Sequence, residues 1–259
     1  MKTALSIAGS DPSGGAGIQA DLKTFAAHGV YGMAAITAIT AQNTLGVFAV
    51  EPVAVPLVAS QLDAVFADIF PDAVKIGMIP DATAARAVAE TLSRAGARNV
   101  VVDTVMVSSS GRRLLDEGGE RALMALLFPR ARLVTPNIPE AEALTGIAIT
   151  DRDGMSRAAR TLSSFTPGGV LLKGGHLEDA ADDLLLVDGE EFWYRSARID
   201  TRHTHGTGCT LSSAIAANLA RGLSLAEAVK EGKEYVRQAI LAAPGLGRGN
   251  GPLRHDRRI

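Results

Sequence analysis

Short, mostly apolar runs alternate with helix-forming patterns along most of the chain, and this alternation constrains the fold more than any other feature. Apolar runs without regular polar positions predict strands that are covered on both faces. We expect them at residues 3–8, 73–77, 99–102, 132–134 and 169–172. Strands of this kind, separated by helices, are typical of a parallel sheet between two helical layers. We therefore expect an α/β fold with three α/β/α layers and a mostly parallel central sheet.

The segments between these strands carry helix signals. Helical patterns cover residues 18–27, 56–70, 119–128 and 151–165. Asp81 is expected to cap a helix that ends at Gly96. Two further helices are expected after Cys209 and at Ser224, where Ser224 and Glu227 have the spacing of a capping box.

Other segments are expected to be extended or irregular. Residues 31–41 predict one strand, and residues 46–53 predict a small flap or edge strand. Residues 184–194 predict a hairpin around the Asp-Gly turn at 188–189. The tail, residues 245–259, is rich in Gly and Arg and is expected to be loose.

Composition sets limits on the class of protein. A chain of 259 residues is long enough for one large domain, so we expect a single domain over residues 1–259. A formal net charge of −2 argues against nucleic acid or an anionic membrane as the main partner. The single cysteine excludes an internal disulfide framework and a cysteine-based zinc site, and it suits a reducing compartment. We find no leader pattern and no apolar run of roughly 18 residues, so we expect a cytoplasmic protein.

A nine-residue loop with four glycines, residues 9–17, follows the first expected strand. A strand, a glycine-rich loop and a helix resemble the start of a nucleotide-binding unit. However, the spacing fits neither G-x-G-x-x-G nor G-x-x-x-x-G-K-[ST]. A dinucleotide-binding or P-loop assignment is therefore not supported.

A second glycine-containing turn, Gly206-Thr207-Gly208, leads into a helix that begins around Cys209. The first turn of a helix offers free N–H groups and the positive end of its dipole to an anion. The same dipole favours a thiolate, so we expect a lowered pKa for Cys209. The structural alternative is a tight turn that ends in a buried cysteine.

Several unusual polar residues come directly after expected strands. These positions are residues 9–11, Gln42 and Asn43, Asp103, residues 137–140, and Lys173. Ligands of open parallel sheets bind at the carboxyl ends of the strands. We therefore expect these side chains to meet at one rim, together with the turn before Cys209.

These residue types suggest phosphoryl transfer, which needs a phosphate cradle, a divalent cation and a base near the acceptor hydroxyl. The turn at residues 206–208 can form the cradle, and Lys173 can neutralise phosphate charge. Asp103 and Glu140 supply oxygen ligands suited to Mg²⁺. Cys209 or a nearby residue would be the base.

Each of these side chains also has a purely structural interpretation. Asp103 could cap a turn, Glu140 could only complement a helix dipole, and Lys173 could be a surface charge. The histidines of this region have no clear metal-ligand partners, so we expect no metal site at His176, His203 and His205.

Several stretches together resemble the ribokinase-like superfamily, and within it the hydroxymethylpyrimidine/phosphomethylpyrimidine kinases of thiamine biosynthesis. The matching stretches are residues 8–24, 40–44, 75–78, 135–142, 172–176 and 204–216, and the ending at 251–255. They run in family order, and their combination is highly specific. The resemblance implies a ribokinase-like fold with a small β flap, and a homodimer.

The resemblance also implies an ATP- and Mg²⁺-dependent kinase. Its substrates would be 4-amino-5-hydroxymethyl-2-methylpyrimidine and then the monophosphate of that alcohol. Positions that match the family's pyrimidine pocket are Gly9, Asp21, Gln42, Met78 and Val105. Gln and Asp offer the donors and acceptors that the edge of an aminopyrimidine needs, and a thioether packs well on an aromatic ring.

The same resemblance assigns the phosphate-transfer residues. Asn137 and Glu140 match the Asn-x-x-Glu motif that organises Mg²⁺, with Asp103 as the second carboxylate. Contacts with ATP are implied for Asn137, Lys173, His176 and Thr207. Cys209 occupies the position of the catalytic base, which is Asp in ribokinase-type sugar kinases, and Gly206 and Gly208 flank the anion cradle.

One departure from the family pattern follows Asp103. The family usually has Pro where this chain has Thr104. Because Pro fixes φ, we expect the loop after Asp103 to be less constrained here, with the role of Asp103 retained.

Alternative functions remain open at this point. The main one is a pyridoxal kinase of the cysteine-containing type, because pyridoxal also carries a hydroxymethyl group on a flat nitrogen heterocycle. A sugar kinase fits less well, since the pocket lacks the groups that would grip several hydroxyls. A non-catalytic pyrimidine-binding protein is the alternative from a different class.

Overall fold

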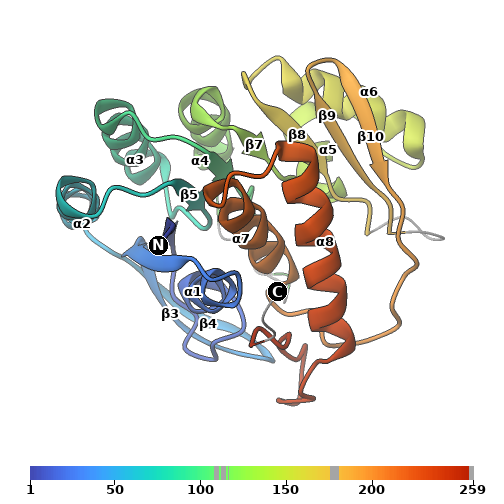
Figure 1. The fold of residues 1–259 in the computed structure, drawn as a ribbon, viewed down its shortest axis with the longest axis horizontal. Coiled ribbons are helices and arrows are strands. Elements are labelled where there is room, and N and C mark those ends of the chain that lie inside the picture. The colour runs from blue at the N-terminus through green and yellow to red at the C-terminus, as the bar shows by residue number, and fades with distance from the viewer. Residues whose placement is uncertain (108–110, 112–114, 116, 176–180, 257–259) are drawn as a thin grey trace.

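A sheet of eight strands forms the middle layer of the computed structural model, which describes residues 1–107, 111, 115, 117–175 and 181–256. Across the sheet the strands are β10 (Glu190–Tyr194), β9 (Asp183–Val187), β8 (Gly169–Leu172), β7 (Leu133–Val134), β6 (Val100–Val102), β5 (Ala73–Ile76), β1 (Thr3–Ala8) and β2 (Tyr31–Ile36). From β2 to β8 all neighbours are parallel, whereas β9 runs antiparallel to both β8 and β10. The expectation of a mostly parallel sheet is confirmed (Figure 1).

Helices cover both faces of this sheet (Figure 1). One layer contains α1 (Gly17–Ala27), α7 (Thr207–Ala220) and α8 (Leu225–Leu241). The other contains α2 (Val55–Asp68), α3 (Ala82–Ala95), α4 (Glu117–Ala122), α5 (Ile138–Thr145) and α6 (Arg152–Ser163). The three-layer α/β/α class is therefore confirmed.

Neighbouring residues of one strand supply different cores. In β6, Val100 and Val102 belong to the cluster that contains α2 and α3, whereas Val101 belongs to the cluster that contains α7. Successive side chains of a strand point to opposite faces of a sheet. All three valines are buried because both faces are covered, and this explains why the strand has no polar position.

Local signals placed several turns and helix ends correctly. The Asp81 side chain accepts a hydrogen bond from Ala84 N–H, and Gly96 ends α3 in the left-handed region with φ 67°. The β9–β10 hairpin turns through Asp188 and Gly189, both with positive φ, which is the type I′ pattern that twisted hairpins prefer. The capping box at Ser224 also begins α8.

The prediction of one strand over residues 31–41 is wrong. The chain leaves the central sheet after β2, and Thr37 separates β2 from β3 (Ala38–Asn43). Thr37 N–H donates to the carbonyl of Ala8, and its hydroxyl donates to the carbonyl of Met78 at 2.6 Å. β3 then pairs antiparallel with β4 (Gly46–Pro52), which forms the small flap that the family resemblance implied.

The helix predicted over residues 119–128 is also different. α4 ends at Ala122, a π-helical turn, η1 (Leu123–Leu127), follows, and a 3₁₀ turn, η2 (Phe128–Arg130), closes the segment. Pro129 has no N–H to continue a helical ladder, which accounts for the tight last turn.

The tail is not loose over the part that the structure describes. Gly251 carbonyl accepts from His205 N–H, and Asn250 N–H donates to the carbonyl of Thr44 in the flap turn. The side chains of Leu253 and His255 are buried. His255 Nε2 lies 3.0 Å from the Thr210 hydroxyl on α7, so the tail is anchored to that helix. Among the described residues, no helix is both long and apolar enough to span a membrane.

The buried tail histidine predicts an acid-sensitive fold. Burial lowers the pKa of His255 to about 4, and Lys23 adds to the effect. An unfolded histidine protonates near pH 6.5, so between pH 6.5 and 4 the unfolded state binds a proton that the folded state does not. The free energy of unfolding should therefore fall by about 3 kcal/mol over this range on account of this group.

A His255→Gln variant tests this contribution by chemical denaturation at several pH values. Gln keeps an acceptor for Thr210 and cannot titrate, so the variant should lose less stability than the wild type between pH 6.5 and 4. His28 is the internal reference, because burial lowers the pKa of His28 to about 4 in both proteins. Equal losses in wild type and variant would rule out this role of His255.

Candidate active site

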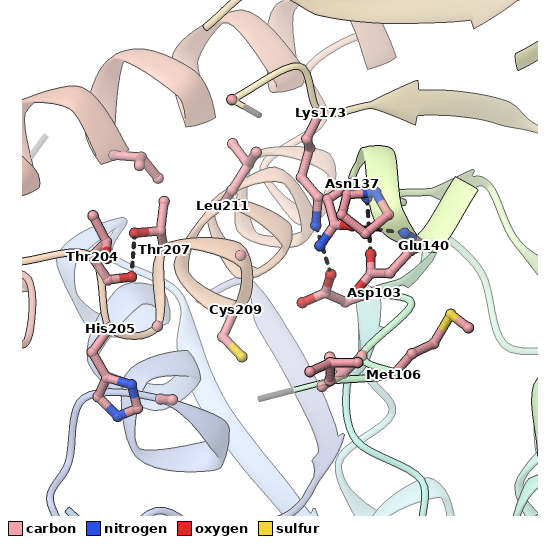
Figure 2. A pocket seen from close by; sticks show the side chains of 18 of the residues that line it. Asp103, Met106, Asn137, Glu140, Lys173, Thr204, His205, Thr207, Cys209 and Leu211 are labelled. Atoms are coloured by element: carbon pink, nitrogen blue, oxygen red, sulfur yellow. Dashed lines mark hydrogen bonds and ion pairs between the residues drawn. The ribbon is translucent and has the colours of Figure 1, made fainter. Parts of the chain in front are cut away.

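One cavity of about 1280 Å³ lies at the carboxyl ends of the parallel strands, beside the N-terminus of α7. Figure 2 shows side chains from α5, α7 and the strand ends facing this space. The predicted site residues that line it are Gly9, Gln42, Met78, Asp103, Val105, Asn137, Glu140, Lys173, Gly206, Thr207, Gly208 and Cys209. The expectation that the strand-end residues among them meet at one edge of the sheet is therefore confirmed. The role of each residue stays a prediction.

The turn before α7 approaches the glycine-rich loop at backbone distance. Gly206 caps α7 with φ 79°, and a side chain there would meet the carbonyl oxygen of Gly15 at 1.8 Å. Only glycine combines that conformation with so close a contact. Gly208 in turn faces Lys173 and Asp103, whose nearest side-chain atoms lie 3.6 and 3.8 Å from its added Cβ position. An anion at this helix start would therefore meet free N–H groups and the Lys173 ammonium.

Asp103 follows β6 and forms an ion pair with Lys173, with Nζ and Oδ1 3.2 Å apart. Ser212 Oγ lies 3.1 Å from the other carboxylate oxygen. Burial opposes ionisation of Asp103, but Lys173 and Lys75 outweigh it and hold the pKa of the carboxyl below its usual value. Lys173 is largely covered, so it is not a surface charge, and Asp103 and Glu140 raise its pKa against the effect of burial.

Glu140 caps a helix and also lines the cavity. With Asn137 it forms the capping box of α5, because each side chain accepts a hydrogen bond from the backbone N–H of the other residue. Its Oε2 also accepts a hydrogen bond of 2.8 Å from the Thr104 hydroxyl. Burial raises the pKa of Glu140, and Lys173 only partly offsets this. The carboxylate still lines the cavity.

The donor set suits Mg²⁺ bound together with a nucleotide. Within the described ranges no group of three or more His, Cys, Asp or Glu side chains is placed to enclose a metal ion. The cavity instead offers the two carboxylates of Asp103 and Glu140. Mg²⁺ is usually held in this way, by one or two carboxylates, substrate phosphates and retained waters.

The predicted low pKa of Cys209 is wrong. The thiol lies in the first turn of α7, as expected, but burial raises the pKa of Cys209 to about 11. Lys75 lowers it, while the negative charges of Asp21 and Asp103 raise it further. The helix dipole is therefore outweighed by desolvation and by neighbouring carboxylates.

Asp21 does not line the cavity. Its carboxylate is completely buried beneath the site, where both oxygens lie 2.9 Å from Lys75 Nζ. The hydroxyls of Ser6 and Ser213 also donate to it. The structure thus gives Asp21 a supporting position, instead of the direct contact with a pyrimidine that the resemblance implied.

The other predicted pyrimidine residues do line the cavity. Gly9 lies against Met78, whose sulfur would be 3.1 Å from a Cβ added to the glycine. Gln42 extends from the flap strand β3, and Val105 follows Asp103. His176, for which the resemblance implied a contact with ATP, lies outside the described residues.

Two residues organise the site in a way that was not expected from the sequence, which placed Asp11 only among the rim residues 9–11 and His205 only outside any metal site. Asp11 accepts hydrogen bonds from the backbone N–H groups of Ser13, Gly15 and Ala16, so it fixes the glycine-rich loop. His205 Nε2 lies 2.8 Å from the same carboxylate. Burial opposes ionisation of the Asp11 carboxyl, but hydrogen bonds from His205 and Ser13 outweigh this effect and lower the pKa of Asp11 to about 2. An aspartate ahead of a serine and two glycines was the available signal, since Asp commonly bonds nearby backbone N–H groups.

Comparisons with known proteins agree with this geometry. A family model described as phosphomethylpyrimidine kinase matches residues 11–254. The chain belongs to this family. A hydroxymethylpyrimidine/phosphomethylpyrimidine kinase of Rhizobium meliloti is 52% identical over 259 residues, which cover 98% of this chain and 97% of the relative. A thiamine biosynthesis bifunctional protein of Geobacter sulfurreducens is 51% identical, and the chain spans 51% of its length.

Solved structures match the fold closely. A phosphomethylpyrimidine kinase of Clostridium difficile is 47% identical with a TM-score of 0.83, covering 93% of this chain and all of that one, 100%. The pyridoxal kinase of Staphylococcus aureus, solved with pyridoxal, has a higher TM-score of 0.92 at 34% identity, covering 99% and 94% of the two chains. The same enzyme has been solved with AMP-PCP. Membership of the phosphomethylpyrimidine kinase family makes the protein a phosphotransferase.

The buried Lys75–Asp21 pair predicts a large loss of stability when it is broken. Lys75→Met leaves the Asp21 carboxylate buried without its cation, so the free energy of unfolding should fall by about 3–5 kcal/mol, measured by urea denaturation. The double variant Lys75→Met/Asp21→Asn removes both charges and should recover part of this loss. A double variant that is no more stable than Lys75→Met would contradict the charge argument.

Proposed function

We propose that the protein transfers the γ-phosphoryl group of ATP to the hydroxyl of 4-amino-5-hydroxymethyl-2-methylpyrimidine. A second transfer to the resulting monophosphate then gives the diphosphate for thiamine biosynthesis. The observation that supports this most directly is the meeting of Cys209, the Gly206–Gly208 turn and the Asp103–Lys173 pair in one cavity. The chain shares this family with kinases named for both substrates.

The α7 turn and Lys173 would hold the transferring phosphoryl group. The free N–H groups of the first helical turn and the ammonium both favour the charge on its equatorial oxygens. Asp103 and Glu140 would hold Mg²⁺, which supplies charge neutralisation on the polyphosphate. Asn137 and Thr207 line the same region and are proposed nucleotide contacts.

The pyrimidine would lie on the other side of Cys209, between the glycine-rich loop and the flap. Met78 and Val105 offer apolar contacts for the flat ring, and Gln42 offers an amide that can pair with its edge. Asp21 would act through the floor of the site, because its carboxylate is occupied by Lys75.

Cys209 is the proposed base for the first transfer. With a pKa of about 11, only about one thiol in 10⁴ is ionised at pH 7 in the empty cavity. The thiolate that does form is a stronger base than an ordinary cysteine would be. The second transfer has a different requirement, because a phosphate monoester with a second pKa near 6 is already ionised at neutral pH.

This difference between the two acceptors gives an internally controlled test of Cys209. Cys209→Ala should lower kcat for the alcohol by about 10²–10⁴, the usual contribution of general-base catalysis, and lower kcat for the monophosphate by less than tenfold. Cys209→Asp restores a base and should recover part of the activity on the alcohol. ATP-dependent turnover of both substrates is measured for each variant.

Two outcomes would contradict the assignment of the base. Near-wild-type turnover of the alcohol by Cys209→Ala would leave Cys209 as a packing residue. Equal losses on both acceptors would show that the thiol positions the substrate or the phosphoryl group and takes no proton.

A pyridoxal kinase is the second candidate, supported by the close match to the pyridoxal kinase fold. We expect kcat/KM to be higher for the pyrimidine alcohol than for pyridoxal by at least tenfold, which corresponds to about 1.4 kcal/mol in the barrier. Steady-state kinetics with the two alcohols at saturating ATP measure this ratio. A preference for pyridoxal would overturn the proposed substrate.

The assembly and location of the protein are further proposals. Large apolar side chains of the flap are exposed, with Ile39, Leu45 and Phe48 accessible to 49%, 53% and 64%. Apolar side chains gathered in this way mark an association surface, which supports a homodimer. A kinase that consumes ATP and carries one unpaired cysteine suits the cytoplasm.

A further inference from the structure

We propose that Thr104 is a positioning residue that orients the Glu140 carboxylate toward the divalent cation of the bound nucleotide. The inference rests on the proposed function, since it assigns Glu140 a place beside that cation. Thr104 does not line the cavity and is completely buried, so it would act only through its neighbours.

The contacts of Glu140 are divided unequally between its two oxygens. Oε2 accepts the Thr104 hydroxyl at 2.8 Å and the Asn137 backbone N–H at 2.9 Å. From the described residues, Oε1 receives no hydrogen bond. Two donors on one oxygen fix the plane of the carboxylate, and they leave Oε1 as the oxygen that can serve a ligand in the cavity. The capping box alone would supply one of these two donors.

The backbone at Thr104 is fixed as well. Val105 N–H donates to the carbonyl of Asp103 at 2.9 Å, the i→i+2 bond of a γ-turn centred on Thr104. Thr104 is not among the residues with positive φ, so the turn is of the inverse type, in which the central φ is near −75°. These contacts hold the loop after Asp103 in place, while the expectation that threonine constrains it less than proline stays a prediction. The turn and the hydroxyl together hold a segment that carries Asp103 on one side and Val105 on the other.

Proline would fit this backbone but not the role. The proline ring fixes φ near −65°, close to the φ of the turn. Proline also lacks an N–H, but among the described contacts the Thr104 N–H makes no hydrogen bond, so none would be lost. Asp103 directly follows β6, and its N–H continues the pairing with β5 by donating to the carbonyl of Ile76. Extended backbone is the conformation that proline favours in the residue before it. A proline here, as the family resemblance led us to expect, would therefore preserve the turn and remove only the donor to Glu140.

Three substitutions separate the hydroxyl from the shape of the loop. Thr104→Val keeps the side-chain volume without the hydroxyl, Thr104→Ser keeps the hydroxyl, and Thr104→Pro keeps the turn without the hydroxyl. The direct readout is binding of Mn²⁺, as a paramagnetic substitute for Mg²⁺, to each protein in the presence of AMP-PCP. Electron paramagnetic resonance of free Mn²⁺, compared with protein-free mixtures of Mn²⁺ and AMP-PCP, gives the dissociation constant of the protein complex without turnover.

Thr104→Val and Thr104→Pro should each weaken Mn²⁺ binding by about tenfold, the lower end of the range for residues that orient a metal ligand. Thr104→Ser should stay within about twofold of the wild type. In turnover assays, the Mg²⁺ concentration for half-maximal rate should rise in the same two variants, while KM for the pyrimidine stays unchanged. If the substitutions disturbed the whole site, the Mg²⁺ concentration for half-maximal rate and KM for the pyrimidine would rise together, and this result would contradict a specific role in orienting Glu140.

Unchanged Mn²⁺ affinity in either folded variant that lacks the hydroxyl would overturn the inference. If Thr104→Val fails to fold, Thr104→Pro against Thr104→Ser decides the question, and equal affinity in that pair counts against the role of the hydroxyl. The proposed function fails separately: a wild-type protein that binds Mn²⁺ with AMP-PCP but does not phosphorylate the pyrimidine would refute the function alone.

Discussion

Parallel strands bring their carboxyl ends to one edge of a sheet, and the whole site depends on this constraint. β1, β5, β6, β7 and β8 point the same way, so residues that follow them meet although they are far apart in the chain. The pair formed by Asp103 and Lys173 spans 70 positions of sequence. The first turn of α7 then closes the rim through the contact between Gly206 and Gly15. That contact tolerates no side chain, so the position of the proposed anion cradle is set by backbone packing.

In and beneath the cavity, buried carboxylates outnumber buried lysine side chains, so the region can accept a cation. Lys75 and Lys173 face the carboxylates of Asp21, Asp103 and Glu140, and every one of these side chains is buried or largely covered. The excess of negative charge is one cause of the raised pKa of Cys209. A divalent cation held by these carboxylates would offset the excess of negative charge. The arrangement therefore suits a nucleotide that is bound together with such a cation.

Local patterns predicted the parts of the structure that local chemistry decides. Asp81, Gly96 and Ser224 act within one turn of their own helix ends, and the sequence around each is sufficient. The break of the strand at Thr37 was not predictable in this way, because its acceptors belong to Ala8 and Met78. The sequences around Ala8 and Met78 are ordinary apolar stretches, and nothing in them indicates a hydrogen bond with Thr37.

The functional residues follow the same division. Asp103 and Lys173 were found because each directly follows a strand, and Glu140 because it lies in the first turn of α5, after the loop that follows β7. Asp21 was assigned to the ligand by resemblance, yet a buried lysine from β5 occupies its carboxylate. No spacing rule connects positions 21 and 75. The looseness of the tail was predicted from its glycines and arginines, although two buried side chains, Leu253 and His255, are enough to anchor its end.

The likeness to pyridoxal kinases separates what the fold decides from what the pocket decides. A hydroxymethyl group on a flat heterocycle is the acceptor in either case, so the proposed anion cradle, carboxylates and base would serve both substrates without change. In the proposed pose, discrimination would come from the edge of the ring, near Gln42 of the flap, and from the faces of the ring, near Met78 and Val105, all of which line the cavity. If the wrong ring were bound, the Gln42 amide would be left without a hydrogen-bond partner. This would cost more binding free energy than the loss of an apolar contact. If Gln42 acts as proposed, the choice between the two substrates depends on a single flap side chain more than on the central sheet, and a TM-score of 0.92, which compares backbones, does not report on it.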